Sequence, residues 1–98
     1  MSFHLSRKAK ADLKVIAKYT EKAWGRAQRN TYLEKIDRSF HDLANRPDKG
    51  QNCDGVRQGY RKYRIGKHII YYRMTEPKHI EIVRVLHGSM DIERHLNE

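Results

Sequence analysis

The chain has 98 residues, of which 34% are charged and 38% are hydrophobic, and its formal net charge is +9. This length fits a single domain spanning residues 1–98 and leaves no room for a second, and the composition is that of a globular protein rather than a disordered one. The positive charge predicts attraction to polyanions, namely DNA, RNA, an anionic membrane face or an acidic protein, without choosing among them.

The single cysteine and the absence of long apolar runs bear on the cellular compartment. Cys53 is the only cysteine, so an internal disulfide framework of the kind found in small secreted domains is excluded. The first ten residues lack the apolar stretch of a signal peptide, and no run of 18 apolar residues could cross a bilayer. We therefore expect a cytoplasmic protein.

The first half of the chain predicts a helical hairpin preceded by a short strand. Phe3 to Leu5 can form the strand, and Ser6 is a suitable N-cap for the helix that follows. Gly25 separates this helix from a second one over Arg26 to Asn45, which Pro47 prevents from continuing. Apolar residues recur at steps of three and four along one face of each helix: Ala9, Leu13, Ile16 and Ala17, then Leu33, Ile36, Phe40, Leu43 and Ala44.

The second half is rich in Tyr, Ile and Val and predicts three strands. Their expected ranges are Val56 to Ile65, His68 to Thr75 and His79 to Leu86, and the short connections between them favour sequential antiparallel pairing. A short helix from Met90 to His95 would follow. The predicted fold class is α+β, with the N-terminal helical hairpin packed on one face of an antiparallel sheet and a short C-terminal helix.

Neither face of the last predicted strand is cleanly polar. Strict alternation places Ile80, Ile82, Arg84 and Leu86 on one face and Glu81, Val83 and Val85 on the other. We therefore expect the second face of the sheet to be covered partly by the C-terminal helix and partly by another chain. A thin satellite core under the C-terminal helix is an equally good explanation.

Basic and aromatic residues alternate along the predicted strands. The arginines are Arg57, Arg61, Arg64, Arg73 and Arg84, and the tyrosines are Tyr60, Tyr63, Tyr71 and Tyr72. Guanidinium groups bind phosphates and aromatic rings stack on bases, so the pattern suits an RNA surface, although it equally suits an acidic peptide or simply solvated arginines beside sheet tyrosines.

His87 is the best candidate for an acid or base, because imidazole titrates near neutral pH. Together with Arg61 and Arg84 it could cleave RNA if folding brought the three together, whereas the alternative is a histidine that only caps a turn by hydrogen bonding. The six histidines and Cys53 show no metal-ligand spacing, and nothing near Cys53 predicts an activated thiol. The sequence thus predicts no metal and no cofactor.

The order of several short motifs resembles the ParE toxins of type II toxin-antitoxin systems, within the RelE/ParE superfamily. They are Leu5-Ser6, Ala9 with Asp12-Leu13, Tyr19-Thr20, Trp24-Gly25, Leu43-Ala44, Pro47, Gly50, Arg57, Gly59-Tyr60-Arg61, His68, Tyr72-Arg73, Arg84 to Asp91 and His95-Leu96. The resemblance covers nearly the whole chain and implies the RelE/ParE-like α+β fold.

The resemblance also implies an activity. ParE toxins inhibit DNA gyrase by trapping it on cleaved DNA and have no catalytic residues, whereas the RelE branch cuts messenger RNA on the ribosome, for which Arg61, Arg84 and His87 would be the candidates here. A basic nucleic-acid-binding domain without toxicity is a third possibility. On the ParE interpretation, the candidate target-binding residues are Arg57, Tyr60, Arg61, Arg84, His87, Met90 and Arg94.

A ParE-like toxin implies a ParD-like antitoxin with an acidic segment that folds onto the toxin in a hetero-oligomer. DNA would then be contacted only through gyrase and the antitoxin, and no membrane would be involved. A strongly basic domain with apolar grooves suits such a partner. The candidate antitoxin-binding residues lie along the helical hairpin: Leu13, Ile16, Tyr19, Trp24, Ile36 and Phe40.

Overall fold

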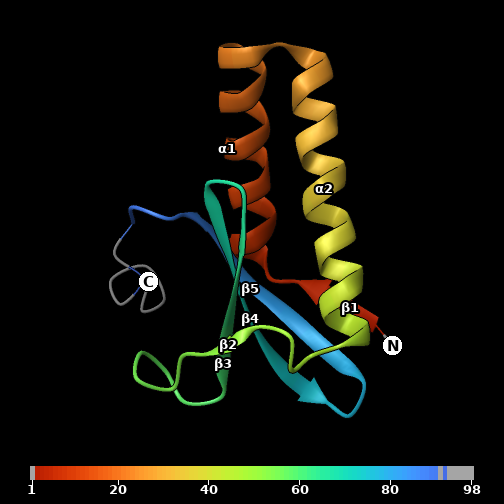
Figure 1. Ribbon diagram of the computed structural model, residues 1–98, viewed down its shortest axis with the longest axis vertical. Coiled ribbons are helices and arrows are strands. Elements are labelled where there is room, and N and C mark those ends of the chain that lie inside the picture. Colours follow the sequence, from red (N-terminus) through yellow and green to blue (C-terminus); the bar gives the residue numbers. More distant parts are fainter. Residues whose placement is uncertain (1, 91, 93–98) are drawn as a thin grey trace.

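The computed structural model describes residues 2–90 and residue 92, and it forms two layers, a helical hairpin and a five-stranded sheet (Figure 1). The elements in chain order are β1 (Ser2–Leu5), α1 (Arg7–Trp24), α2 (Arg26–Asn45), β2 (Gln51–Asn52), β3 (Tyr60–Ile65), β4 (His68–Glu76) and β5 (His79–His87). The helices cover one face of the sheet. The predicted α+β architecture is therefore confirmed.

Local chemistry explains where the helices begin and end. The Ser6 hydroxyl accepts a hydrogen bond from the Ala9 N–H (3.0 Å) and donates one to the Val83 carbonyl (2.7 Å), so this N-cap also joins α1 to β5. Gly25, with φ +92°, ends α1 and directs the chain into α2. A residue with a side chain would be strained at that φ, which is why the hairpin turns at a glycine.

The sheet differs from the prediction at both of its edges. The order is β1-β5-β4-β3-β2, and β3, β4 and β5 are antiparallel as expected, but β1 pairs parallel to β5, so the sheet is mixed. Short β2 was not predicted. The strand expected to start at Val56 starts at Tyr60, because the segment before it forms turns in which the Cys53 carbonyl accepts hydrogen bonds from the backbone N–H groups of Val56 and Arg57.

The main core fills the space between the helical hairpin and the sheet. Its buried residues are Ala9, Ile16, Ile36, Phe40, Leu43, Ala44, Ile70, Tyr72, Ile80, Ile82 and Val85. The core thus uses the apolar stripes that the helix periodicity predicted.

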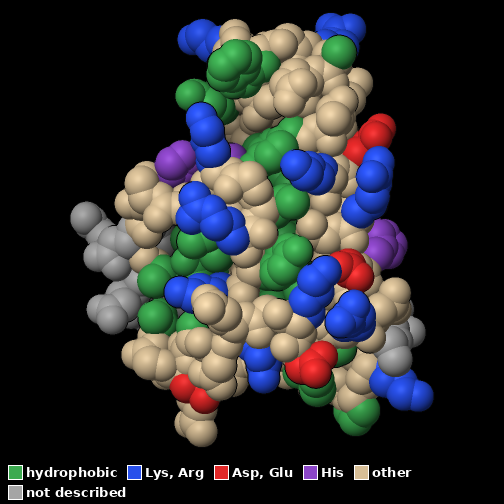
Figure 2. Space-filling view, in the orientation of Figure 1, with side chains coloured by type: hydrophobic (Ala, Val, Ile, Leu, Met, Phe, Trp, Pro, Cys, Tyr) green, Lys and Arg blue, Asp and Glu red, His purple; other side chains and the backbone are tan. Residues whose placement is uncertain are grey.

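The surface around this core is strongly basic. Figure 2 shows Lys and Arg side chains spread over one face of the molecule, with few acidic side chains among them.

A β-bulge in β5 makes the predicted face assignment wrong after Ile82. Tyr71 pairs with Arg84 but the next residue, Tyr72, pairs with Ile82, so Val83 has no counterpart in β4. Ile80, Ile82 and Val85 consequently belong to the helix-side core, while Leu86 belongs to a second cluster. Strict alternation could not reveal this one-residue insertion.

The second face of the sheet is covered differently at its two ends. At one end Cys53, Tyr71 and Leu86 form a small cluster against which Tyr60, Ile69 and Ile92 pack. This agrees with the satellite-core interpretation, although most of the helix predicted over Met90 to His95 lies outside the described residues. Burial raises the pKa of the Cys53 thiol, which is consistent with a structural cysteine.

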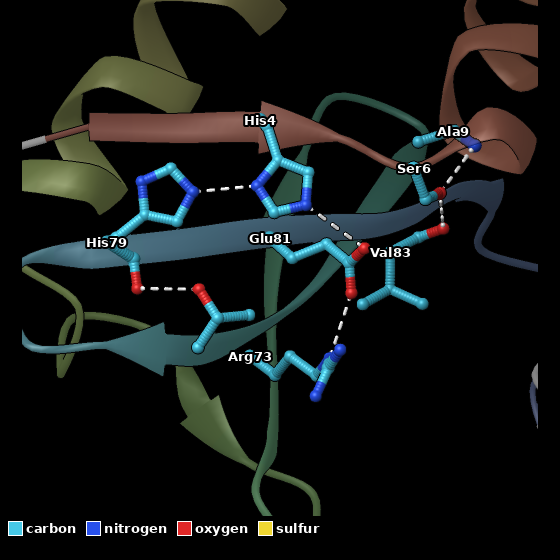
Figure 3. A network of polar contacts seen from close by, with 8 residues as sticks. His4, Ser6, Ala9, Arg73, His79, Glu81 and Val83 are labelled. Atoms are coloured by element: carbon cyan, nitrogen blue, oxygen red, sulfur yellow. Dashed lines mark hydrogen bonds and ion pairs between the residues drawn. The ribbon is translucent and has the colours of Figure 1, made fainter.

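The other end of that face carries a chain of polar contacts that joins three strands (Figure 3). The two imidazoles of His4 and His79 are hydrogen-bonded (2.7 Å), His4 Nε2 contacts Glu81 (3.2 Å), and Glu81 accepts a hydrogen bond from Arg73 (2.9 Å). Burial disfavours the charge of Glu81, but the contacts with Arg73 and His4 outweigh it and lower the pKa of that carboxyl. The network links β1 to β5 and β4 on the face away from the helices.

Tyr72 connects the sheet to the loop after α2, and we predict that its hydroxyl contributes about 1–3 kcal/mol to the free energy of unfolding. The buried hydroxyl donates to the Pro47 carbonyl (2.8 Å) and accepts from the Gly50 N–H (2.8 Å). Tyr72→Phe should lower the free energy of unfolding in urea by that amount, because both backbone groups lose their partner. Tyr19→Phe, at a tyrosine that is 69% exposed, should change it by less than about 0.5 kcal/mol; equal effects would contradict this role.

Candidate binding groove

An open groove of about 1020 Å³ lies between the helical hairpin, the β3–β4 turn and the end of β5. It is lined mainly by apolar atoms. From α1 and α2 come Asp12, Val15, Ile16, Tyr19, Thr20, Trp24, Gln28 and Tyr32; from the sheet side come Gly66, Lys67, His68, Arg84, Val85, Leu86, His87, Ser89 and Met90. A groove of this size and lining is suited to an apolar ligand surface or a helix.

Large hydrophobic side chains stand exposed along the wall of the groove. Val15 is 67% exposed, Tyr19 and Trp24 are each 69% exposed, and Met90 is 46% exposed. Of the large hydrophobic residues exposed in the described part of the chain, only Met74 lies away from the groove. Clustered exposed apolar side chains of this kind indicate an interaction surface.

An ion pair between α1 and β5 forms part of the groove floor. The guanidinium of Arg84 donates from Nε and Nη2 to the two carboxylate oxygens of Asp12, at 2.9 Å each, and the Val85 N–H donates to the same carboxylate (2.9 Å). The side chains of Asp12 and Arg84 are only 12% and 11% exposed. Arg84 was predicted to meet the target or a phosphate; its guanidinium binds Asp12 in the structure, so a target would have to compete with this ion pair, and the role stays a prediction.

Three aromatic side chains form the end of the groove near the β3–β4 turn. The Tyr32 hydroxyl is hydrogen-bonded to His68 Nδ1 (2.6 Å), and the rings of His68 and His87 meet edge to face with centroids 5.6 Å apart. His87 is exposed, and its Nδ1 lies 2.8 Å from the Ser89 hydroxyl and accepts from the Ser89 N–H (3.1 Å). This is the turn-capping contact that was the alternative to an acid-base role.

The three residues considered for RNA cleavage do not all share one site, because Arg84 and His87 line the groove and Arg61 does not. Arg61 donates to the Gly50 carbonyl (2.7 Å) beside β2, Arg84 is held by Asp12, and His87 is bonded to Ser89. Their functional atoms therefore serve three separate contacts. Of the other target-binding candidates, Arg57 lies over the Tyr60 ring (5.6 Å) on the second-face side of the sheet, and Arg94 lies outside the described residues.

The structure separates the antitoxin-binding candidates into two groups. Ile36 and Phe40 are 1% and 2% exposed in the main core, so their predicted place on a docking surface is wrong. Leu13 is partly buried against the same core, and Ile16, 5% exposed, lines the groove floor. Tyr19 and Trp24 are accessible. Sequence analysis missed Val15. This residue lies four positions before Tyr19, so both are on the same side of α1 and off its core stripe, and that spacing could have indicated it.

The half-buried imidazole of His68 should make stability depend on pH. Burial and, to a lesser degree, nearby His87 lower the pKa of His68, so the folded state favours the neutral ring and the unfolded state binds the proton more readily. We expect stability to fall as pH drops below about 6.5 and through the folded-state pKa, and His68→Gln to show a weaker fall. Urea unfolding at pH 7 and pH 5, with an NMR titration of the ring, checks this; a His68 pKa above the unfolded value would contradict it.

The described residues give no support for metal binding or membrane insertion. Within residues 2–90 and 92, no group of three or more His, Cys, Asp or Glu residues is placed to hold a metal ion. In the same part of the chain, none of the helices has the length and apolar character needed to span a bilayer.

Comparisons with known proteins identify the family. Residues 3–92 match the family model described as the ParE toxin of the type II toxin-antitoxin system, parDE. Toxin ParE1 of Caulobacter vibrioides is 39% identical over 94 residues, which cover 96% of each chain, and Toxin ParE1 of Mycobacterium tuberculosis is 40% identical over 92 residues, which cover 94% of each. A solved structure of the chromosomal ParDE system from P. aeruginosa shares the fold, with a TM-score of 0.75, 22% identity, and coverage of 89% of this chain and 95% of that one. The chain therefore belongs to the ParE toxin family of type II toxin-antitoxin systems.

Proposed function

We propose that this toxin acts in the cytoplasm by binding DNA gyrase and stabilising its complex with cleaved DNA, and that it is not an enzyme. The observation that carries the proposal is the family match over residues 3–92. The geometry supports it, because the best candidates for an RNA-cleaving site, Arg61, Arg84 and His87, are each engaged in a separate contact. A binding mechanism needs no convergent acid, base and phosphate-binding cation.

The gyrase-facing surface is best placed on the second face of the sheet and the segment after β5. Arg57 and Tyr60 lie together before and at the start of β3, and Met90 follows β5 with 46% of its surface exposed. Arg61 pairs with Tyr72 and donates to the Gly50 carbonyl, so its side chain lies on the other face and is a weaker candidate. This surface combines exposed cations with aromatic and apolar groups, as protein interfaces commonly do. Arg84 is a weaker candidate for this surface, because Asp12 binds its guanidinium.

We further propose that a ParD-like antitoxin silences the toxin by laying an amphipathic, acidic segment in the groove, giving a hetero-oligomer. Apolar side chains of that segment would cover Val15, Tyr19 and Trp24, and its carboxylates would meet the surrounding positive charge of the toxin. A second copy of this chain is a poorer occupant, because two domains of net charge +9 repel each other.

Expression in growing bacteria separates this proposal from the ribonuclease alternative. A gyrase-directed toxin should cause filamentation and a DNA-damage response while messages stay intact. A ribosome-dependent ribonuclease should instead stop translation rapidly and leave cleaved messages. Growth arrest accompanied by cleaved messages and no damage response would overturn the proposal.

A further inference from the structure

A row of lysines runs along the solvent face of α1. Lys10, Lys14, Lys18 and Lys22 follow one another at four-residue steps, and all four are exposed. At 1.5 Å per residue the row is about 18 Å long, and four-residue steps keep it on one side of the helix. Lys14 and Lys18 each lie two residues from buried Ile16, which places the row roughly opposite the core. We call these four residues the lysine row.

The lysine row lacks nearby compensating charge, in contrast to the second helix of the hairpin. In the described part of the chain, none of the four lysines takes part in an ion pair, and the two acids of α1, Asp12 and Glu21, contact Arg84 and Arg29. On α2 the charges alternate in sign and pair along the helix, Glu34 with Arg38 and Asp37 with His41. Only α1 therefore presents a continuous line of like charge, an arrangement that destabilises a helix unless a polyanion neutralises it.

The surroundings of the lysine row indicate which polyanion it fits. The one aromatic residue between the lysines, Tyr19, belongs with Val15 to the groove wall, so the row itself consists of charged groups alone and has no series of aromatic rings on which the bases of a single strand could stack. Four-residue steps space the lysines about 6 Å apart along a regular helix, so several of them can reach successive phosphates of one DNA strand, and duplex DNA carries one charge per about 1.7 Å of its axis. Phosphate contacts of this kind are independent of sequence.

We propose that the lysine row binds the phosphate backbone of duplex DNA directly, without sequence preference. None of the four lysines lines the groove, so DNA and an occupant of the groove would take different faces of α1. The inference goes beyond gyrase inhibition: a toxin acting on a gyrase-DNA complex would also contact the DNA itself. Its test needs no gyrase, so its failure would leave the proposed function standing.

The test is binding of a fluorescein-labelled 20-base-pair duplex, followed by anisotropy between 50 and 200 mM salt. The full chain should bind with affinity that falls steeply with salt, and Lys10→Gln, Lys14→Gln, Lys18→Gln and Lys22→Gln together should weaken binding at least about tenfold and reduce the log-log salt slope by about 3. Circular dichroism should show that this quadruple variant stays folded, because all four side chains are exposed.

A control variant with the same loss of charge distinguishes the row from net charge. Lys35→Gln, Arg38→Gln, Arg46→Gln and Lys78→Gln remove four exposed charges outside α1 and should weaken binding much less. Equal losses in the two quadruple variants, or no duplex binding at 50 mM salt, would overturn the proposal. So would competition by poly-L-glutamate as effective, charge for charge, as unlabelled duplex, since that would indicate an acidic protein as the partner.

Discussion

Replacing Asp12 by alanine should lower the free energy of unfolding by about 3–5 kcal/mol, the largest stability effect we expect from a single substitution in this protein. The carboxylate of Asp12 holds the guanidinium of Arg84 through two hydrogen bonds and also accepts the Val85 N–H. Removal leaves a nearly buried positive charge and a backbone donor without this partner, and it separates α1 from β5. Urea unfolding followed by circular dichroism measures the loss.

Two control variants test whether burial is the cause. Glu21→Ala removes a carboxylate from the more exposed contacts with Arg26 and Arg29 and should cost no more than about 1 kcal/mol. Asp12→Leu combined with Arg84→Met replaces the whole pair by apolar groups and should recover much of the stability lost in Asp12→Ala. A loss below about 1 kcal/mol in Asp12→Ala would show that the pair does not hold α1 on the sheet.

Tyr19→Glu should weaken binding of the proposed ParD-like antitoxin about 100-fold, equivalent to about 2.7 kcal/mol. Tyr19 is 69% exposed on the groove wall, so the change removes an aromatic contact and places a negative charge against an acidic partner without disturbing the core. Isothermal titration calorimetry of the purified proteins gives the affinity, and co-expression should show that the variant toxin is no longer neutralised.

Met74→Glu is the matched control for this experiment. Met74 is also a large exposed hydrophobic residue, at 57%, but it lies on β4 away from the groove. The same apolar-to-acidic change there should alter antitoxin affinity less than about threefold. If Met74→Glu weakened binding as much as Tyr19→Glu, the antitoxin would be attracted by overall charge and the groove would not be its docking site.

The parts of the fold predicted correctly are those fixed by neighbouring residues. Ser6, Gly25 and Pro47 mark the helix ends through local backbone chemistry, and the three-and-four spacing of apolar residues locates the buried stripes. The bulge at Val83 has no such local signal, since it arises from the pairing of β5 with β4, and it places Val85 in the helix-side core and Leu86 in the second cluster, the reverse of strict alternation. The parallel pairing of β1 likewise depends on a strand that lies more than 70 residues away.

The site was harder to predict because the sequence does not show which polar and apolar groups find partners. Arg84 looked like an available phosphate ligand, but its partner Asp12 is 72 residues away along the chain. Ile36 and Phe40 belong to the apolar stripe of α2. This stripe packs against the sheet in the main core, so it is not available to a partner. Tyr19 and Trp24 were named as antitoxin-binding candidates; both are exposed on the groove wall, where Val15 joins them, and their role in binding stays a prediction.

The most direct test of the central claim is a plasmid supercoiling assay with purified gyrase and ATP, comparing the toxin alone with the toxin plus its antitoxin. A gyrase-directed toxin should cause loss of supercoiling and accumulation of linear, gyrase-dependent cleaved DNA, both relieved by the antitoxin. Unchanged supercoiling in the presence of a folded toxin that still arrests growth would contradict gyrase as the target and make RNA the target to examine.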